Sequence, residues 1–194
     1  MTVANKEIRI LKTLVVIVNM LVLLPPILFH LGLERIATFL YSGLGFLCHQ
    51  RADRSFFLFG EQLTYEKSTV QGIVPFDQIM TISFGKRFTC NEELGCKFGV
   101  CSRCTGMYLG VLVGVFLSEL MQRWKIPKIF PLFLLVPLAL DGIIQTIAYV
   151  LAPERGFYES TNPRRFITGV LFGFGVGYLA VSAIKTVIAK TEES

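Results

Sequence analysis

Four long apolar runs constrain this chain more than any other feature of its sequence. A helix rises about 1.5 Å per residue, so about 20 apolar residues cross the hydrocarbon core of a bilayer, which is about 30 Å thick. The sequence therefore predicts membrane-spanning helices at about residues 11–31, 106–123, 129–151 and 166–188. With 53% hydrophobic and 17% charged residues, the chain is too apolar for an ordinary soluble domain. We expect an all-α membrane protein in which residues 1–194 form a single polytopic membrane domain.

Two other stretches complete the expected architecture. Residues 34–47 are apolar but offer only about 12 uninterrupted positions, so a re-entrant or interfacial helix is favoured over a crossing. From about 48 to 104 the chain is polar, and we expect a small extramembrane loop domain there. Segments 69–74 and 78–84 look like short β-strands within it.

The basic residues indicate how the chain lies in the membrane. A net charge of +5 could suggest nucleic-acid binding, but these residues stand singly at the ends of the apolar runs, so we exclude it. The first run is too long for a signal-peptide core and lacks a cleavage pattern, so we expect it to remain as a helix. The positive-inside rule favours cytoplasmic termini and an outer location for the cysteines; a crossing by residues 34–47 would invert this. The residues that support this orientation are Lys6, Arg9, Lys12, Arg123, Lys125, Lys128, Lys185 and Lys190.

A paired-thiol turn runs directly into the second predicted span. Cys101 and Cys104 are three residues apart, a spacing that allows one metal ion to be bound or one disulfide to form, and a helix N-terminus beside them favours the thiolate. Together with Cys48 and His49 they supply four ligands of the kind that tetrahedral Zn²⁺ uses. Adjacent residues such as Cys48 and His49 rarely both bind one ion, so a three-ligand site with an open position is an alternative to a closed site.

Two other functions fit the same cysteines. The first is a redox membrane protein that passes electrons between thiols and a quinone, with Cys90 and Cys96 as a shuttle pair. It is similar to the vitamin K epoxide reductase and disulfide-forming oxidoreductases, four-helix proteins with a C-x-x-C at a helix start, although a lone C-x-x-C is a weak signal. The second is a non-catalytic structural or accessory subunit. The sequence does not decide whether the protein is an enzyme.

Polar residues in and beside the predicted spans form a second candidate site. Asp141 and Gln145 are four residues apart and project from one helix face. An Asp at a helix centre costs about 2.5–3.5 kcal/mol on insertion scales, so Asp141 should face the bundle interior and find a partner. We expect this pair to be catalytic or to line a polar cavity; the alternative is a hydrogen bond that clamps two helices.

Arginines near the cysteines and near the fourth span are candidates for anion binding. Guanidinium groups match phosphate oxygens, so a lipid headgroup is the expected ligand and membrane lipids are the expected partners. For any single arginine, ordinary anchoring at the membrane interface is the alternative. The candidates are Arg51, Arg54, Arg103, Asn162 and Arg165.

The order of the spans predicts how these sites are arranged. Two crossings separate Cys104 from the polar loop at 153–165, so both should lie on one side of the membrane. We expect Asn162 within about 15 Å of the cysteines, with Gln145 and then Asp141 deeper in the bundle. Small residues at 106, 110, 114 and 118, and at 169, 173 and 177, predict close packing of the second and fourth spans.

Several motifs together resemble one known family. The chain is similar to a family of predicted prokaryotic membrane proteins known as a domain of unknown function, over about residues 40–175. This resemblance implies a fold of membrane helices with a shared polar site and no assigned activity. The loop between Gly60 and Cys101 is longer than the family pattern, so the resemblance implies no role for Cys90 or Cys96. The motifs are CHQR (48–51), RSFF (54–57), CSRCTGMYLG (101–110), DGIIQ (141–145) and STNPRRFITG (160–169).

Overall fold

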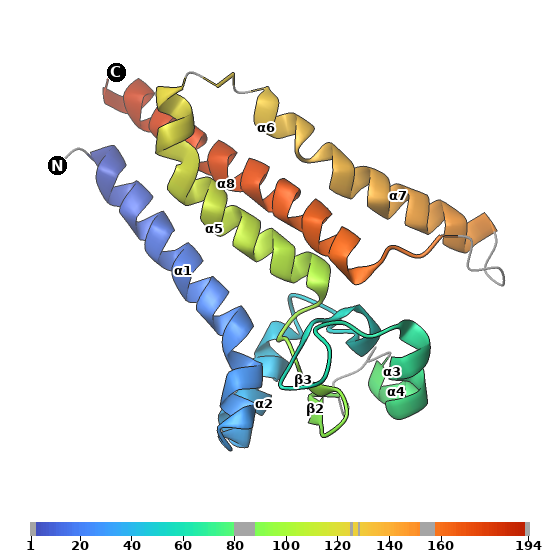
Figure 1. Cartoon of the computed structure of the whole chain (residues 1–194). Coiled ribbons are helices and arrows are strands. Elements are labelled where there is room, and N and C mark those ends of the chain that lie inside the picture. The colour runs from blue at the N-terminus through green and yellow to red at the C-terminus, as the bar shows by residue number, and fades with distance from the viewer. Residues whose placement is uncertain (1–2, 80–87, 125, 128, 152–157, 193–194) are drawn as a thin grey trace. The chain divides into compact units, whose positions relative to one another are not determined.

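The computed structural model describes residues 3–79, 88–124, 126–127, 129–151 and 158–192. It divides into two compact units (Figure 1). The bundle unit consists of Met1–Asn19 and Gly106–Ser194, and the loop unit is Met20–Thr105. The predicted single polytopic domain would contain both.

Helices long and apolar enough to cross a membrane number four within the described residues. Their apolar stretches are Asn5–His30, Ser102–Arg123, Phe130–Ala148 and Asn162–Thr191. This result confirms the predicted all-α membrane class. The helices begin earlier than the apolar runs: α1 is Val3–His30, α5 is Ser102–Arg123 and α8 is Asn162–Glu192.

Prolines affect two of the spans differently. Helix α1 contains Pro25 and Pro26 and continues past both to His30. The third span, predicted as one helix, consists instead of α6 (Phe130–Phe133) and α7 (Val136–Leu151). Pro137 is the second residue of α7, and because it has no backbone N–H it cannot continue the helical hydrogen bonding from α6.

Glycines bring α5 and α8 into close contact in the bundle unit, as predicted (Figure 1). A Cβ at Gly106, Gly110 or Gly114 would collide with backbone oxygens of α8, and one at Gly173 or Gly177 with backbone oxygens of α5. The facing residues of α8 advance in step with those of α5, so the two helices are parallel. This direction is the one expected for two spans that have one other span between them.

Polar contacts join α1 to α5 within the same unit. The Asn19 side chain donates to the Tyr108 carbonyl oxygen at 3.1 Å, and Lys12 pairs with Glu119 at 2.9 Å. These two pairs run in opposite directions along the helices, so α1 and α5 are antiparallel there.

The loop unit contains short elements around a small core. Helix α2 (Glu34–Leu44) follows α1, and a 3₁₀ turn, η1 (Ala52–Arg54), precedes a three-stranded antiparallel sheet in the order β1-β3-β2. The strands are β1 (Phe57–Leu58), β2 (Cys90–Asn91) and β3 (Gly95–Lys97). Cys90 and Cys96 face each other across β2 and β3 and form a disulfide.

Two expected β-segments differ from the structure. Residues 69–73 lie in α3 (Lys67–Ile73), because Val70, Ile73 and Val74 have helical spacing and pack into the core. Gln78 lies in α4 (Phe76–Ile79), whereas positions 80–84 of the second segment lie outside the described residues.

Helix α2 is too short to cross a bilayer at 11 residues, in agreement with the predicted re-entrant or interfacial helix. Its Ala37, Tyr41 and Leu44 are buried in the loop unit. On its other side, Ile36 and Phe39 are 52% and 76% exposed. Apolar exposure of this extent on a short helix fits a lipid-facing surface.

Candidate metal centre

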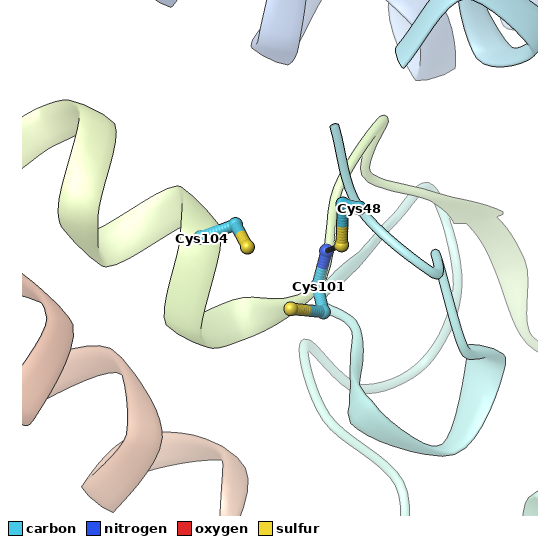
Figure 2. A group of neighbouring side chains, drawn as sticks. All are labelled: Cys48, Cys101 and Cys104. Carbon is cyan, nitrogen blue, oxygen red and sulfur yellow. Dashed lines mark hydrogen bonds between the residues drawn. The ribbon is translucent and has the colours of Figure 1, made fainter. Parts of the chain in front are cut away.

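Three thiols converge in the loop unit (Figure 2). Cys48 lies in the segment after α2, Cys101 immediately precedes α5, and Cys104 is in the first turn of α5. Their sulfur atoms lie within 4.8 Å of one another. Tetrahedral Zn²⁺ with Zn–S bonds of about 2.3 Å would separate its sulfur ligands by about 3.8 Å. Small side-chain movements would therefore suffice to bind one ion.

Backbone donors surround the Cys48 sulfur. It accepts hydrogen bonds from the N–H of Gln50 at 3.4 Å and from the N–H of Cys101 at 3.3 Å. Figure 2 shows the second of these bonds, which joins positions 53 residues apart. Donors directed at a sulfur favour its thiolate, the form that binds metals.

The thiols also shift one another's pKa values. Hydrogen bonds from the Cys101 thiol and then from the Cys104 thiol lower the pKa of Cys48 to about 2, although burial opposes this change. For Cys101, the hydrogen bond with Cys104 lowers the pKa, but the bond with Cys48 and burial outweigh it and raise the pKa. As the pH rises, Cys48 therefore loses its proton and becomes a thiolate before Cys101 does.

The described residues provide three ligands in this group. His49, the fourth predicted ligand, is adjacent to Cys48 but has an exposed side chain and does not belong to the thiol cluster. Its role stays a prediction. The other two cysteines, Cys90 and Cys96, are joined in the disulfide.

The arginines after Cys48 surround an acidic residue that sequence reasoning missed. Asp53 is buried, and Arg51 donates to both of its carboxylate oxygens, at 3.0 and 2.7 Å. Arg54 lies 4.0 Å from the same carboxylate. An anion at Arg51 would therefore compete with an existing ion pair. The order of Arg51, Asp53 and Arg54 in the sequence, with the acidic residue between two arginines, was the signal that could have indicated this ion pair. The third predicted arginine near the thiols, Arg103, is half-buried in α5.

Asp141 is buried in the bundle unit and has a hydrogen-bond partner, as expected. The Tyr158 hydroxyl donates to its Oδ1 at 3.0 Å, and Arg164 donates to the Tyr158 hydroxyl at 3.1 Å. Arginine has no acceptor, so the tyrosine proton must point to Asp141 and this carboxylate oxygen must accept it. Sequence reasoning missed Tyr158 because 17 residues separate it from Asp141.

The other predicted polar residues also belong to the bundle unit. Asn162 and Arg165 are buried near the start of α8, and Gln145 is half-buried in α7. The thiols belong to the loop unit, so their expected separation from Asn162, about 15 Å, stays a prediction.

The apolar spans define this chain as an integral membrane protein. Residues 93–179 match the model of a family described as "Predicted membrane protein (DUF2085)". This match includes Cys101, Cys104, Asp141 and Asn162, but it begins after Cys48 and so does not include it.

Two archaeal proteins are similar to the chain. It is 33% identical over 141 residues to an uncharacterized protein of Methanocaldococcus jannaschii. The aligned region covers 71% of this chain and 63% of that relative. It is also 34% identical over 87 residues to an uncharacterized protein of Methanothermobacter thermautotrophicus. This second aligned region covers 44% of this chain and 71% of that relative. The chain therefore belongs to the DUF2085 family of predicted membrane proteins. No solved structure matches it.

Proposed function

We propose that the protein is a membrane metalloprotein in which Cys48, Cys101 and Cys104 bind one Zn²⁺-type ion. The observation that carries this proposal is the convergence of three sulfurs within 4.8 Å. Thiolates are soft ligands that favour zinc over magnesium or calcium. The two N–H donors on Cys48 support a bound thiolate.

The fourth coordination position is proposed to be open to water or to a substrate group. Structural zinc sites usually have four protein ligands, whereas catalytic ones have three and an exchangeable position. The described cluster has three, which favours the second type. Should His49 move to bind the ion, the site would be closed and structural.

The bundle unit is proposed to bind the headgroup of a membrane lipid or a similar anion. Support comes from the burial of Arg165 and Asn162, and from the chain of hydrogen bonds that links Arg164, Tyr158 and Asp141. Charged residues inside membrane bundles are costly and commonly mark ligand or ion sites. The anion would contact Arg165 and Asn162, while Asp141 and Gln145 would bind its polar or reacting part.

Cytoplasmic termini and an outer-face thiol centre complete the proposal. Its support is the distribution of lysine and arginine at the ends of the spans. An N-terminal tag that a protease digests in intact cells, before lysis, would contradict this orientation.

A redox function is the second candidate, because the loop unit contains both a disulfide and three free thiols. In that reaction Cys101 and Cys104 would lose two electrons and two protons to a quinone and form a disulfide, and the quinone would become a quinol. The Cys90–Cys96 disulfide would oxidise a pair of substrate thiols and become two thiols. These two thiols would then reduce the Cys101–Cys104 disulfide by thiol–disulfide exchange and form the Cys90–Cys96 disulfide again.

Elemental analysis of protein purified without chelator tests the metal proposal. We expect about one zinc per chain, lost in Cys48→Ser, Cys101→Ser and Cys104→Ser. His49→Ala should retain the ion if the site is open and lose it if the site is closed. Wild-type protein with an intact Cys90–Cys96 disulfide but almost no metal would contradict the proposal. A disulfide formed by Cys101 and Cys104 when quinone is added would support the redox candidate.

A further inference from the structure

Gln50 is a buried polar residue that lies two positions after Cys48 and is 2% exposed. Its side-chain Nε2 is 2.7 Å from the carbonyl oxygen of Tyr41 and 2.7 Å from that of Gly99. Both partners can only accept, so the amide nitrogen must face them. One side chain thus bridges the end of α2 and the segment that leads to Cys101.

The backbone of Gln50 also contacts the thiol centre. Its φ is +50°, in the left-handed region that is uncommon for residues other than glycine. In this conformation its N–H donates to the Cys48 sulfur at 3.4 Å. The side chain and the backbone of one residue therefore connect both stretches that carry ligands.

The segment that Gln50 holds is also fixed by its own packing. The Tyr41 hydroxyl donates to the Lys97 carbonyl oxygen. This bond joins α2 directly to the segment before Cys101, in addition to the bridge through Gln50. Gly99 packs so closely that a Cβ there would lie 2.6 Å from Leu44 Cδ1 and 2.8 Å from the Val22 carbonyl oxygen. Cys101 follows two residues later, so this packing restricts where its sulfur can lie.

We infer that Gln50 is the positioning residue of the thiol centre: it holds Cys48 and Cys101 at metal-binding distance before an ion arrives. This inference rests on the proposed metal function. Residues that orient metal ligands commonly contribute 10–100-fold to metal affinity, and we expect an effect of about that size here.

Two substitutions and one matched control test the inference. Gln50→Glu keeps the shape but directs carboxylate oxygens at two carbonyl oxygens, and Gln50→Ala removes the bridge. Gln71→Glu makes the same chemical change on the exposed surface of α3. Cobalt(II) is titrated into each metal-free protein, and the sulfur-to-cobalt charge-transfer band is followed. We expect both Gln50 variants to bind about 10–100-fold more weakly and Gln71→Glu to match wild type.

Thiol oxidation without metal provides an independent readout. Diamide removes two electrons and two protons from a pair of nearby thiols, so the rate at which it links Cys48 to Cys101 reports their proximity. We expect this rate to fall in both Gln50 variants and to be unchanged in Gln71→Glu. Protection of the Cys90–Cys96 disulfide from cleavage by a mild reductant reports whether the loop unit is folded.

The outcomes separate the inference from the proposed function. Absence of cobalt binding by wild type would contradict the metal proposal, while the oxidation rates would still decide the role of Gln50. Wild-type affinity and oxidation rate in both Gln50 variants would overturn the inference. Loss of disulfide protection in both variants would also overturn it, because Gln50 would then be required for folding in general.

Discussion

At the scale of single residues, the sulfur of Cys48 is the point at which two distant stretches meet. It accepts hydrogen bonds from the N–H of Gln50, in its own turn, and from the N–H of Cys101, the residue before α5. A bound ion would add bonds to all three sulfurs to these weak contacts. The ion should therefore contribute to stability as well as to chemistry, since a metal that binds only the folded state stabilises it.

Removal of the ion should lower the melting temperature of the wild-type protein. We expect a strong chelator to reduce the Tm by several degrees, because the sulfur–metal bonds that join the three cysteines would be lost. Cys101→Ser should already melt at the lower temperature and should not respond to chelator. Differential scanning fluorimetry in detergent measures both; an equal response of the two proteins would count against a metal held by Cys101.

The hydrogen bond between Tyr158 and Asp141 should stabilise the bundle unit. Tyr158→Phe removes the donor and leaves a buried carboxylate oxygen without it, which should cost about 1–3 kcal/mol of unfolding free energy. Tyr178→Phe is the matched control in the same unit, because among the described residues its hydroxyl donates to the Ile126 carbonyl oxygen alone, at a long 3.5 Å. Unfolding in denaturing detergent compares the variants. A smaller loss in Tyr158→Phe than in the control would refute a stabilising role.

At the scale of elements, small residues determine how closely α5 and α8 approach. Lipid chains are as apolar as leucine, so close packing rather than hydrophobic burial drives helix association in membranes. Within the bundle unit, Gly106 of α5 lies against the backbone of Phe166 in α8. The polar residues at the start of α8 therefore lie near the end of this unit that contains Gly106.

Gly110→Leu should separate α5 from α8. The new side chain would collide with the Val170 backbone, and overpacking of this kind costs about 1–3 kcal/mol or more. Gly142→Leu is the control, because a Cβ at Gly142 has no neighbour within 4 Å. Unfolding free energies should fall for the first variant and change little for the second. Equal losses would show that the glycine contact does not hold the helices together.

The exposed side of α2 should lie among lipid headgroups. Phe39→Trp, with its indole on that side, should be quenched by lipids brominated near the headgroup more than by lipids brominated near the chain end. Ser68→Trp, at an exposed position of α3, is the comparison and should be quenched by neither. Stronger quenching of Phe39→Trp by the deep bromines would favour a re-entrant helix instead.

At the scale of the whole molecule, local patterns were predictable and long-range contacts were not. The spans, the thiol turn and the glycine spacing each occupy one continuous stretch, so length and periodicity were enough to find them. Cys48 could be grouped with the thiol turn because sulfur ligands have a recognisable chemistry. The role of Gln50 depends on two carbonyl oxygens, and nothing in a sequence marks a particular carbonyl as a partner.

The helix α3 was misread for a different reason. Its β-branched residues favour a strand, but burial of Val70 and Val74 against one core outweighs that preference. The break between α6 and α7 was missed because the run remains apolar through Pro137. Composition detects a membrane span but does not show where its hydrogen bonds stop.

X-ray absorption at the zinc edge tests the central claim most directly. The protein, purified with its metal, should show three sulfur ligands at about 2.3 Å and one oxygen or nitrogen ligand at about 2.0–2.1 Å. Cys48→Ser should lose one of the three sulfurs, or the metal altogether. A first shell without sulfur, or wild-type protein that binds no zinc while its thiols stay reduced, would contradict a three-thiolate centre.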